Sequence, residues 1–222
     1  MTAFDTRGTT DNRAYDYAGH REIWRAEYDV IERWIPASSR VLDLGCGNGS
    51  LLAALKRSKQ VEELGIDSSE SGIAQCREKG LRARVGRIDV PLDDVAADSF
   101  DVAVCNVTLQ MVMYPEVLLR EMKRVAPVQI VSFANFAFVK NRIAFLLHGR
   151  MPRPMLFGYS WYDTGHIHQL SLLDFRDLCA EVGLRVVEVI GTPRRRPVLD
   201  WLGQALPNLF ASVPIVRTVR DA

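Results

Sequence analysis

Residues 41–51 read VLDLGCGNGSL, and the order of residue types in this stretch decides the fold. Val41, Leu42 and Leu44 form a short strand-like apolar run, three glycines follow at alternate positions, and a helix-like apolar pattern begins at Leu51. Glycine is needed where a backbone turns sharply or where a ligand approaches the main chain closely. The stretch predicts a strand, a tight turn and a helix, and it favours a bound ligand over the alternative of an empty turn.

Two carboxylates accompany this turn. Asp43 lies just before it, and Asp67 ends the next apolar run, 22 residues after Gly45. In strand–loop–helix nucleotide sites an acid at that place binds the ribose hydroxyls, because one carboxylate offers two oxygens to a vicinal diol. We expect Asp67, with the adjoining Ser68, to bind a ribose. The alternative is that Asp67 caps the helix that starts directly after it.

The spacing of the glycines indicates which nucleotide is bound. Dinucleotide loops read G-x-G-x-x-G and hold a pyrophosphate, whereas this loop reads G-x-G-x-G with Ser50 in place of the third glycine. A fixed carboxylate at Asp43 repels a pyrophosphate and attracts a cation. S-adenosylmethionine has an ammonium, a sulfonium and no phosphate, and the run resembles motif I of the class I methyltransferases. We expect Asp43, Gly45, Cys46 and Gly47 to line the amino-acid end of this cofactor.

Composition limits the remaining possibilities. The chain has 222 residues, of which 48% are apolar, and this suits one α/β domain with a sizeable core. A net charge of +1 gives no bulk electrostatic case for nucleic acid or for an anionic membrane, and no apolar run reaches the ~20 residues of a membrane span. Four cysteines without a C-x-x-C pair predict free thiols, no metal site and a cytoplasmic protein.

Strand-like and helix-like runs alternate along most of the chain. We predict a flexible segment over 1–14 and a single domain over 15–222, beginning with a helix over 15–35. Strands are expected at 40–44, 61–66, 82–86, 100–105, 128–133, 184–191 and 209–219, and helices at 50–58, 70–79, 115–125, 138–147, 171–183 and 198–205. The alternation predicts a three-layer, Rossmann-like α/β fold with a mostly parallel seven-stranded sheet and helices on both faces. Pro214 predicts a bulge or an edge position for the last strand.

Two further loops at the carboxyl ends of the strands carry candidate cofactor contacts. Related methyltransferases usually carry an acid where this chain has Arg87. We expect the adenine to be contacted instead by Arg87 stacking on the ring, by the backbone at Ile88 or by the carboxylate of Asp89. The alternative is that Arg87 is a solvated loop residue. Asn106 opens the loop after the fourth strand and is expected to line the methionine end. Gln110 is equally well explained as a packing residue.

An insertion over 134–170 interrupts the alternation and is predicted to cover the active site. Its stretch 159–168 reads YSWYDTGHIH and concentrates aromatic and titratable residues, which is typical of a functional loop. We expect His168 and Asp163 to be catalytic, since either accepts a proton from an attacking nucleophile. The alternative is a structural lid in which His166 and His168 are hydrogen-bonding spacers; as a metal pair they lack further ligands at suitable spacing.

The chain as a whole resembles the MetW family of methionine-biosynthesis proteins, from about residue 25 to residue 219. The resemblance rests on RVLDLGCGNGSLL, PEVLLREMKRV, GRMP and above all YSWYDTGHIHQLSLLDFRDLC. It implies the class I methyltransferase fold, with S-adenosylmethionine as cofactor, S-adenosylhomocysteine as product and a small molecule as methyl acceptor. It also implies an alternative role as a partner of homoserine O-acetyltransferase, an acyltransferase of the methionine pathway. The chain departs from the family at Arg87 and at Ala134, where a proline is usual.

Overall fold

The computed structural model describes residues 25–153, 165–193 and 197–221. Its strands are β1 (Arg40–Leu44), β2 (Glu62–Asp67), β3 (Ala83–Val85), β4 (Val102–Asn106), β5 (Val128–Ser132), β6 (Leu184–Gly191) and β7 (Pro214–Arg220). Its helices are α1 (Ala26–Trp34), α2 (Ser50–Lys59), α3 (Glu70–Glu78), the 3₁₀ helix η1 (Leu109–Met111), α4 (Pro115–Val125), α5 (Val139–His148), α6 (Leu172–Val182), α7 (Pro197–Ala205) and α8 (Pro207–Phe210). The predicted N-terminal segment 1–14 and the first part of the predicted helix over 15–35 lie outside the described residues.

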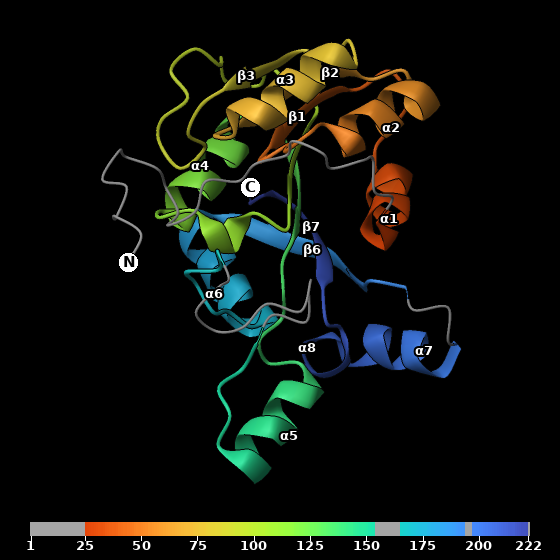
Figure 1. Ribbon diagram of the computed structural model, residues 1–222, viewed down its shortest axis with the longest axis vertical. Helices are drawn as coiled ribbons and strands as arrows, with labels where there is room; N and C mark the ends of the chain where they lie inside the picture. Colours follow the sequence, from red (N-terminus) through yellow and green to blue (C-terminus); the bar gives the residue numbers. More distant parts are fainter. Residues whose placement is uncertain (1–24, 154–164, 194–196, 222) are drawn as a thin grey trace.

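The strands form one seven-stranded sheet in the order β3-β2-β1-β4-β5-β7-β6 (Figure 1). Strands β1 to β5 are parallel, while β7 runs antiparallel to both β5 and β6. The order reverses at β1, where β2 and β4 lie on opposite sides. In such sheets ligands bind outside the carboxyl ends of the strands at the reversal. The predicted mostly parallel sheet is confirmed.

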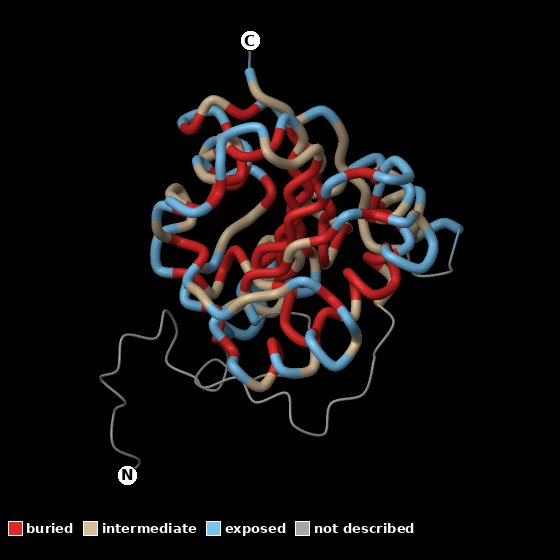
Figure 2. The backbone as a smooth tube through the Cα atoms, turned by 90° about the horizontal axis from the view of Figure 1, so that it is seen from above, coloured by how far each residue is buried: buried red, intermediate tan, exposed pale blue. Residues whose placement is uncertain are grey.

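Helices cover both faces of the sheet, which confirms the three-layer prediction. On one face α1, α2 and α3 bury apolar side chains such as Ile31, Leu52 and Ile73 against the strands. On the other face α4 and α6 contribute residues such as Leu118 and Phe175. Burial is concentrated in the strands, which read as continuous apolar runs because both faces are covered (Figure 2). Of the described helices, none is long and apolar enough to cross a membrane.

The last strand differs from its prediction. Residues 209–213 do not extend it: helix α8 starts with Pro207, whose fixed φ suits the first turn of a helix, and β7 begins at Pro214. The strand is internal, so the predicted edge position is wrong, and the bulge lies in β6 between Val186 and Glu188. Pro214 is tolerated because it is the first residue of its strand, where no hydrogen-bond ladder yet needs its N–H.

Gln110 connects the end of β4 to the insertion that follows β5. Its side chain is 1% exposed; Oε1 accepts a hydrogen bond from the Ala134 N–H at 2.7 Å and Nε2 donates to the His168 carbonyl at 3.1 Å. Its own carbonyl accepts from the N–H groups of Ile167 and His168. Alanine at position 134 supplies the N–H for this bond, whereas a proline has none to donate. Gln110 therefore fixes both ends of the insertion, a role beyond packing.

Replacing Gln110 by alanine is expected to destabilise the fold. The substitution leaves the Ala134 N–H and the His168 carbonyl without partners in a buried place and opens a cavity, which together cost about 2–4 kcal/mol. Urea denaturation followed by circular dichroism measures the change. Gln169→Ala, an exposed glutamine of the same segment, is the control and should stay within about 0.5 kcal/mol of the parent. Equal stability of the two variants contradicts the assigned role.

Candidate functional site

The turn after β1 is built on three glycines in the left-handed region. Gly45, Gly47 and Gly49 have φ of 83°, 54° and 73°, a conformation that only glycine adopts without strain. A Cβ at Gly45 would lie 2.4 Å from Cγ2 of Thr108, which follows β4. The turn therefore packs directly against the loop after β4, and the two loops on either side of the sheet's reversal point lie in contact.

Asp67 connects the turn after β1 to the loop after β2. Its Oδ2 accepts a hydrogen bond from the Gly47 N–H at 2.7 Å, and its Oδ1 accepts from the Ser69 N–H at 2.8 Å. The cap of α3 is Ser69, whose hydroxyl accepts from the Gly72 N–H at 3.2 Å, so the alternative that Asp67 is the cap is wrong. Each Asp67 oxygen retains acceptor capacity for a further hydrogen bond. Ser68 beside it is exposed.

Asp43 is a buried carboxylate that lacks a compensating group. The residue is 2% exposed, and among the described residues nothing hydrogen-bonds to its Oδ1. Burial, followed by the nearby negative charge of Asp67, raises the pKa of Asp43 to about 7. Burying a charge is costly unless an opposite charge lies beside it, so this carboxylate favours a positively charged ligand. Because Asp43 lies near the end of β1, just before the glycine turn, we expect such a ligand to bind at that turn.

Asn106 is the last residue of β4, and the residue after it has a strained backbone. Its Oδ1 accepts a hydrogen bond from the Ser132 hydroxyl at 2.5 Å, which ties it to the end of β5. The next residue, Val107, has a φ of 56°, an unusual conformation for a β-branched residue. Its N–H donates to both the carbonyl and the hydroxyl of Ser132, each at 3.0 Å. Strain of this kind is characteristic of functional loops and here turns the chain sharply toward Thr108 and the glycine turn.

The loop after β3 is organised around Asp89. This carboxylate is 1% exposed; Oδ1 accepts from Nε of Arg87 at 3.2 Å, and Oδ2 accepts from the N–H groups of Met113 and Tyr114. Oδ2 therefore holds the loop to the residues before α4 and Oδ1 is engaged by Arg87, so an adenine contact through Asp89 is disfavoured. Arg87 is exposed although its Nε is bonded to Asp89, and Ile88 is buried; their predicted adenine contacts stay predictions.

All four cysteines are buried and none forms a disulfide. Cys46 and Cys76 both direct their thiols at the carbonyl of Gly47, at 3.9 and 3.4 Å. The hydrogen bond with Cys76 and burial raise the pKa of Cys46, which keeps this thiol protonated and unsuited to nucleophilic attack. Cys46 therefore packs as a small thiol between the turn and Gly65 of β2, and its predicted contact with a cofactor stays a prediction.

Of the two residues predicted to be catalytic, His168 is among the described residues. Asp163 lies outside the described residues. His166 is 7% exposed, its ring meets Phe136 edge-on at 6.2 Å, and burial lowers its pKa to about 4. His168 is half-buried, and its Nε2 has no hydrogen-bond partner among the described residues. In the described ranges no three His, Cys, Asp or Glu side chains gather as metal ligands would.

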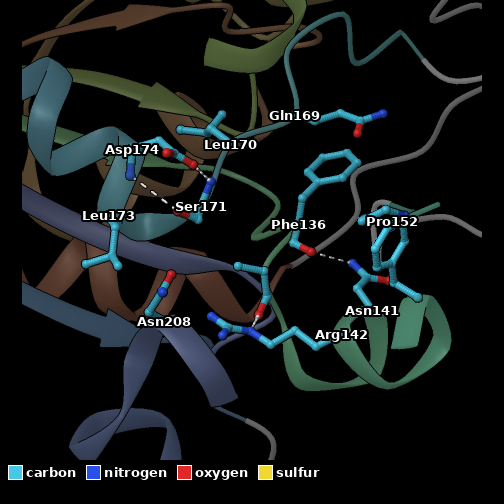
Figure 3. A pocket seen from close by; sticks show the side chains of 12 residues that line it. Phe136, Asn141, Arg142, Pro152, Gln169, Leu170, Ser171, Leu173, Asp174 and Asn208 are labelled. Carbon is cyan, nitrogen blue, oxygen red and sulfur yellow. Dashed lines mark hydrogen bonds between the residues drawn. The ribbon is translucent and has the colours of Figure 1, made fainter. Parts of the chain in front are cut away.

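A separate open pocket of about 480 Å³ lies between the insertion and the start of α6 (Figure 3). It is formed by the segment after β5, helix α5, residues 169–174 and Asn208. None of its lining residues belongs to the glycine turn, to Asp43 or to Asp67. Its walls are mainly apolar, and the side-chain amide of Asn141 and the Ser171–Asp174 pair are engaged in internal hydrogen bonds. The pocket is therefore distinct from the strand-end site, which is formed by Asp43, the glycine turn, Asp67 and Asn106.

The sheet brings the predicted cofactor residues Asp43, Gly45, Gly47, Asp67 and Asn106 to one edge, because parallel strands end there together. The sequence analysis did not identify Val107, Thr108 and Ser132. Their roles depend on a strained φ, a contact with Gly45 and a hydrogen bond between strand ends, and these are tertiary features that leave no local pattern.

Comparisons with known proteins agree with this geometry. Residues 25–217 match the family described as Methionine biosynthesis protein MetW. A bifunctional methionine biosynthesis protein MetXA/MetW of Rhodopirellula baltica is 33% identical over 165 residues, which cover 70% of this chain but only 26%, about a quarter, of that relative. A trans-aconitate 2-methyltransferase of Mycolicibacterium gilvum is 40% identical over 214 residues, covering 89% of this chain and 80% of the relative.

Solved structures match the fold at low identity. A chain of the complex between the Haloferax volcanii Trm112 methyltransferase activator and a methyltransferase has a TM-score of 0.65 at 17% identity, covering 89% of this chain and 90% of that one. An S-adenosylmethionine-dependent methyltransferase from Thermotoga maritima has a TM-score of 0.60 at 17% identity, covering 87% of each chain. The fold is that of the class I S-adenosylmethionine-dependent methyltransferases, and the chain belongs to the MetW family.

Proposed function

We propose that this protein is an S-adenosylmethionine-dependent methyltransferase that acts on a small molecule. One observation carries the proposal: the buried Asp43 carboxylate, with an oxygen that no described residue satisfies, at the end of the strand that enters a three-glycine turn. A phosphate-containing ligand does not suit a fixed negative charge at that place. A ligand that combines a cationic amino-acid end with an adenosine suits both Asp43 and Asp67.

Each part of the cofactor would be contacted by a different group of residues. Asp43 would compensate the cationic end, and Gly45 and Gly47 let the backbone approach it. Asp67 and Ser68 would accept and donate hydrogen bonds at the ribose, and the backbone of Ile88 with the exposed side chain of Arg87 would contact the adenine. Asn106, held by Ser132, would line the methionine end, and Cys46 supports the turn from behind. When bound, S-adenosylmethionine supplies an electrophilic methyl group.

The chain's remaining task is to align and deprotonate an acceptor. Orientation alone provides roughly 7–11 kcal/mol of barrier reduction when the geometry is ideal. A pKa of about 4 makes His166 a weak base at neutral pH, and we propose His168 and Asp163 for the proton transfer. The backbone of His168 is fixed by two hydrogen bonds to Gln110, directly after β4. The trans-aconitate methyltransferase relative makes polycarboxylates the first acceptors to assay.

A second candidate function rests on the Rhodopirellula relative, whose printed name joins MetXA and MetW in one chain. In this reading the protein is a non-catalytic or weakly catalytic partner of a methionine-pathway acyltransferase, homoserine O-acetyltransferase, and the cofactor pocket acts as a sensor. Fusion of two units in one chain raises their effective concentration for each other, which is useful where the units interact. Both readings predict cofactor binding, and they differ in turnover.

Cofactor binding is expected to depend on Asp67. Removing a charged acceptor of ribose hydrogen bonds in Asp67→Ala should weaken S-adenosylmethionine binding about 10- to 100-fold, as measured by titration calorimetry. Asp101→Ala removes an exposed carboxylate that pairs with Arg40 at the other end of the strands, and serves as the control with unchanged affinity. Full-strength binding by the Asp67 variant would show that the ribose lies elsewhere.

Binding is also expected to release a proton from Asp43. In the free protein its pKa is about 7, and a cation beside it lowers that pKa, so binding at pH 7 should release about half a proton, and affinity should rise with pH from 6 to 8. Calorimetry in buffers of different ionisation enthalpy measures this release. Asp43→Asn should bind more weakly and release none. Release of the same proton by that variant would mean that another group titrates.

Turnover separates the two functions. Incubation with S-adenosylmethionine and a panel of carboxylic acids that includes trans-aconitate should yield S-adenosylhomocysteine and a methylated product by mass spectrometry. His168→Ala should keep cofactor affinity and slow this transfer by about 100-fold or more. If no acceptor is methylated, while the protein co-purifies with homoserine O-acetyltransferase at micromolar concentration and raises that enzyme's rate, the partner function holds instead.

A further inference from the structure

Helix α5 presents most of its apolar residues to solvent, while Asn141 is its one buried residue. Leu146 is 81% exposed, Leu147 67%, Phe145 54% and Ile143 50%, whereas Asn141 is 5% exposed. A surface helix of a globular protein normally has the opposite arrangement. The apolar side of α5 therefore lacks a cover among the described residues, and large exposed apolar patches mark interaction sites.

The orientation of α5 is fixed by specific hydrogen bonds. The Asn141 side chain donates to the carbonyls of Phe136 at 3.1 Å and Arg153 at 2.9 Å, and accepts from the Arg153 N–H at 3.3 Å. These bonds join the helix to the segments before and after it. Since rotation of the helix would break them, the outward position of Leu146 and Leu147 is a built feature.

Helix α5 extends beyond the sheet at one end of the molecule (Figure 1). The segment after it continues the pattern, with Met151 59% exposed. The surface that α5 and residues 149–153 offer is therefore a projecting ridge. A lipid surface accepts a projecting apolar ridge without a matching groove, whereas a protein partner needs one.

Cations flank the apolar residues of this ridge. The exposed residues Lys140, Arg142, Arg150 and Arg153 lie within 139–153, and the chain has no Asp or Glu between Glu121 and Asp163. The whole-chain net charge of +1 conceals this local excess, because the acids lie elsewhere. Long basic side chains beside an apolar helix face reach toward anionic headgroups while their methylenes stay among apolar groups.

We propose that α5 and residues 149–153 form a peripheral membrane-binding element that lies in the headgroup region of an anionic bilayer. Leu146, Leu147 and Ile143 enter the acyl boundary, and the flanking cations contact the headgroups. A helix of ten residues is too short to span a bilayer, and the proposed element lies in the headgroup region without spanning it. The proposal does not depend on methyl transfer, because cofactor residues lie on other elements.

Vesicle co-sedimentation tests the proposal with the full chain. We expect binding to vesicles of equimolar phosphatidylcholine and phosphatidylglycerol, and at least tenfold weaker binding to pure phosphatidylcholine. Leu146→Glu with Leu147→Glu should abolish binding, and Lys140→Gln with Arg150→Gln should weaken it about 25-fold. These side chains are exposed, so the variants should keep their circular dichroism and S-adenosylmethionine affinity. Arg77→Glu on α3 changes the net charge as much as the double leucine variant and should bind like the parent.

Three outcomes would overturn the proposal. The first is absence of binding by the parent protein to anionic vesicles at low salt. The second is equal loss of binding in Arg77→Glu, which would make net charge the cause. The third is a dimer, detected by light scattering, that the double leucine variant dissociates while vesicles are not bound. In that case the ridge is an interface between two copies of the chain.

Discussion

The hydrogen bonds of the Asp67 carboxylate organise the strand-end site. They hold the Gly47 and Ser69 N–H groups at fixed positions, so the turns after β1 and β2 form one surface. The left-handed φ of Gly45 and its packing against Thr108 add the loop after β4. Asp43 lies within this arrangement with an oxygen that no described residue satisfies. These contacts are formed without a ligand, and the proposed cation preference depends on the oxygen of Asp43 that they leave unsatisfied.

The insertion after β5 connects this site to the rest of the molecule. Gln110 fixes both of its ends from a position directly after β4, and Asn141 fixes α5 within it. The two residues are buried amides that satisfy several backbone groups each, which makes them costly to replace. His168 is positioned by the same contacts that anchor the insertion. The placement of His168 and the placement of α5 therefore depend on hydrogen-bond networks within the same insertion.

Much of this architecture could be predicted from local sequence. The glycine turn, the Ser171 capping box and the alternation of strands and helices are encoded within a few residues. The last strand was misjudged because a proline in a strand has several tolerated positions, and only the pairing of β7 with β5 and β6 selects among them. The roles of Asp89 and Gln110 could not be predicted, since each depends on contacts with residues more than twenty positions away.

The outward apolar face of α5 shows a further limit of pattern reading. The spacing of apolar residues correctly predicts a helix over 138–147, yet periodicity alone does not say which side meets the protein. The deciding residue is Asn141, because three hydrogen bonds hold its buried amide against the protein. Burying an apolar stripe against the domain would require Asn141 to lose those bonds or face solvent. The fold instead keeps the amide satisfied and leaves Leu146 and Leu147 exposed.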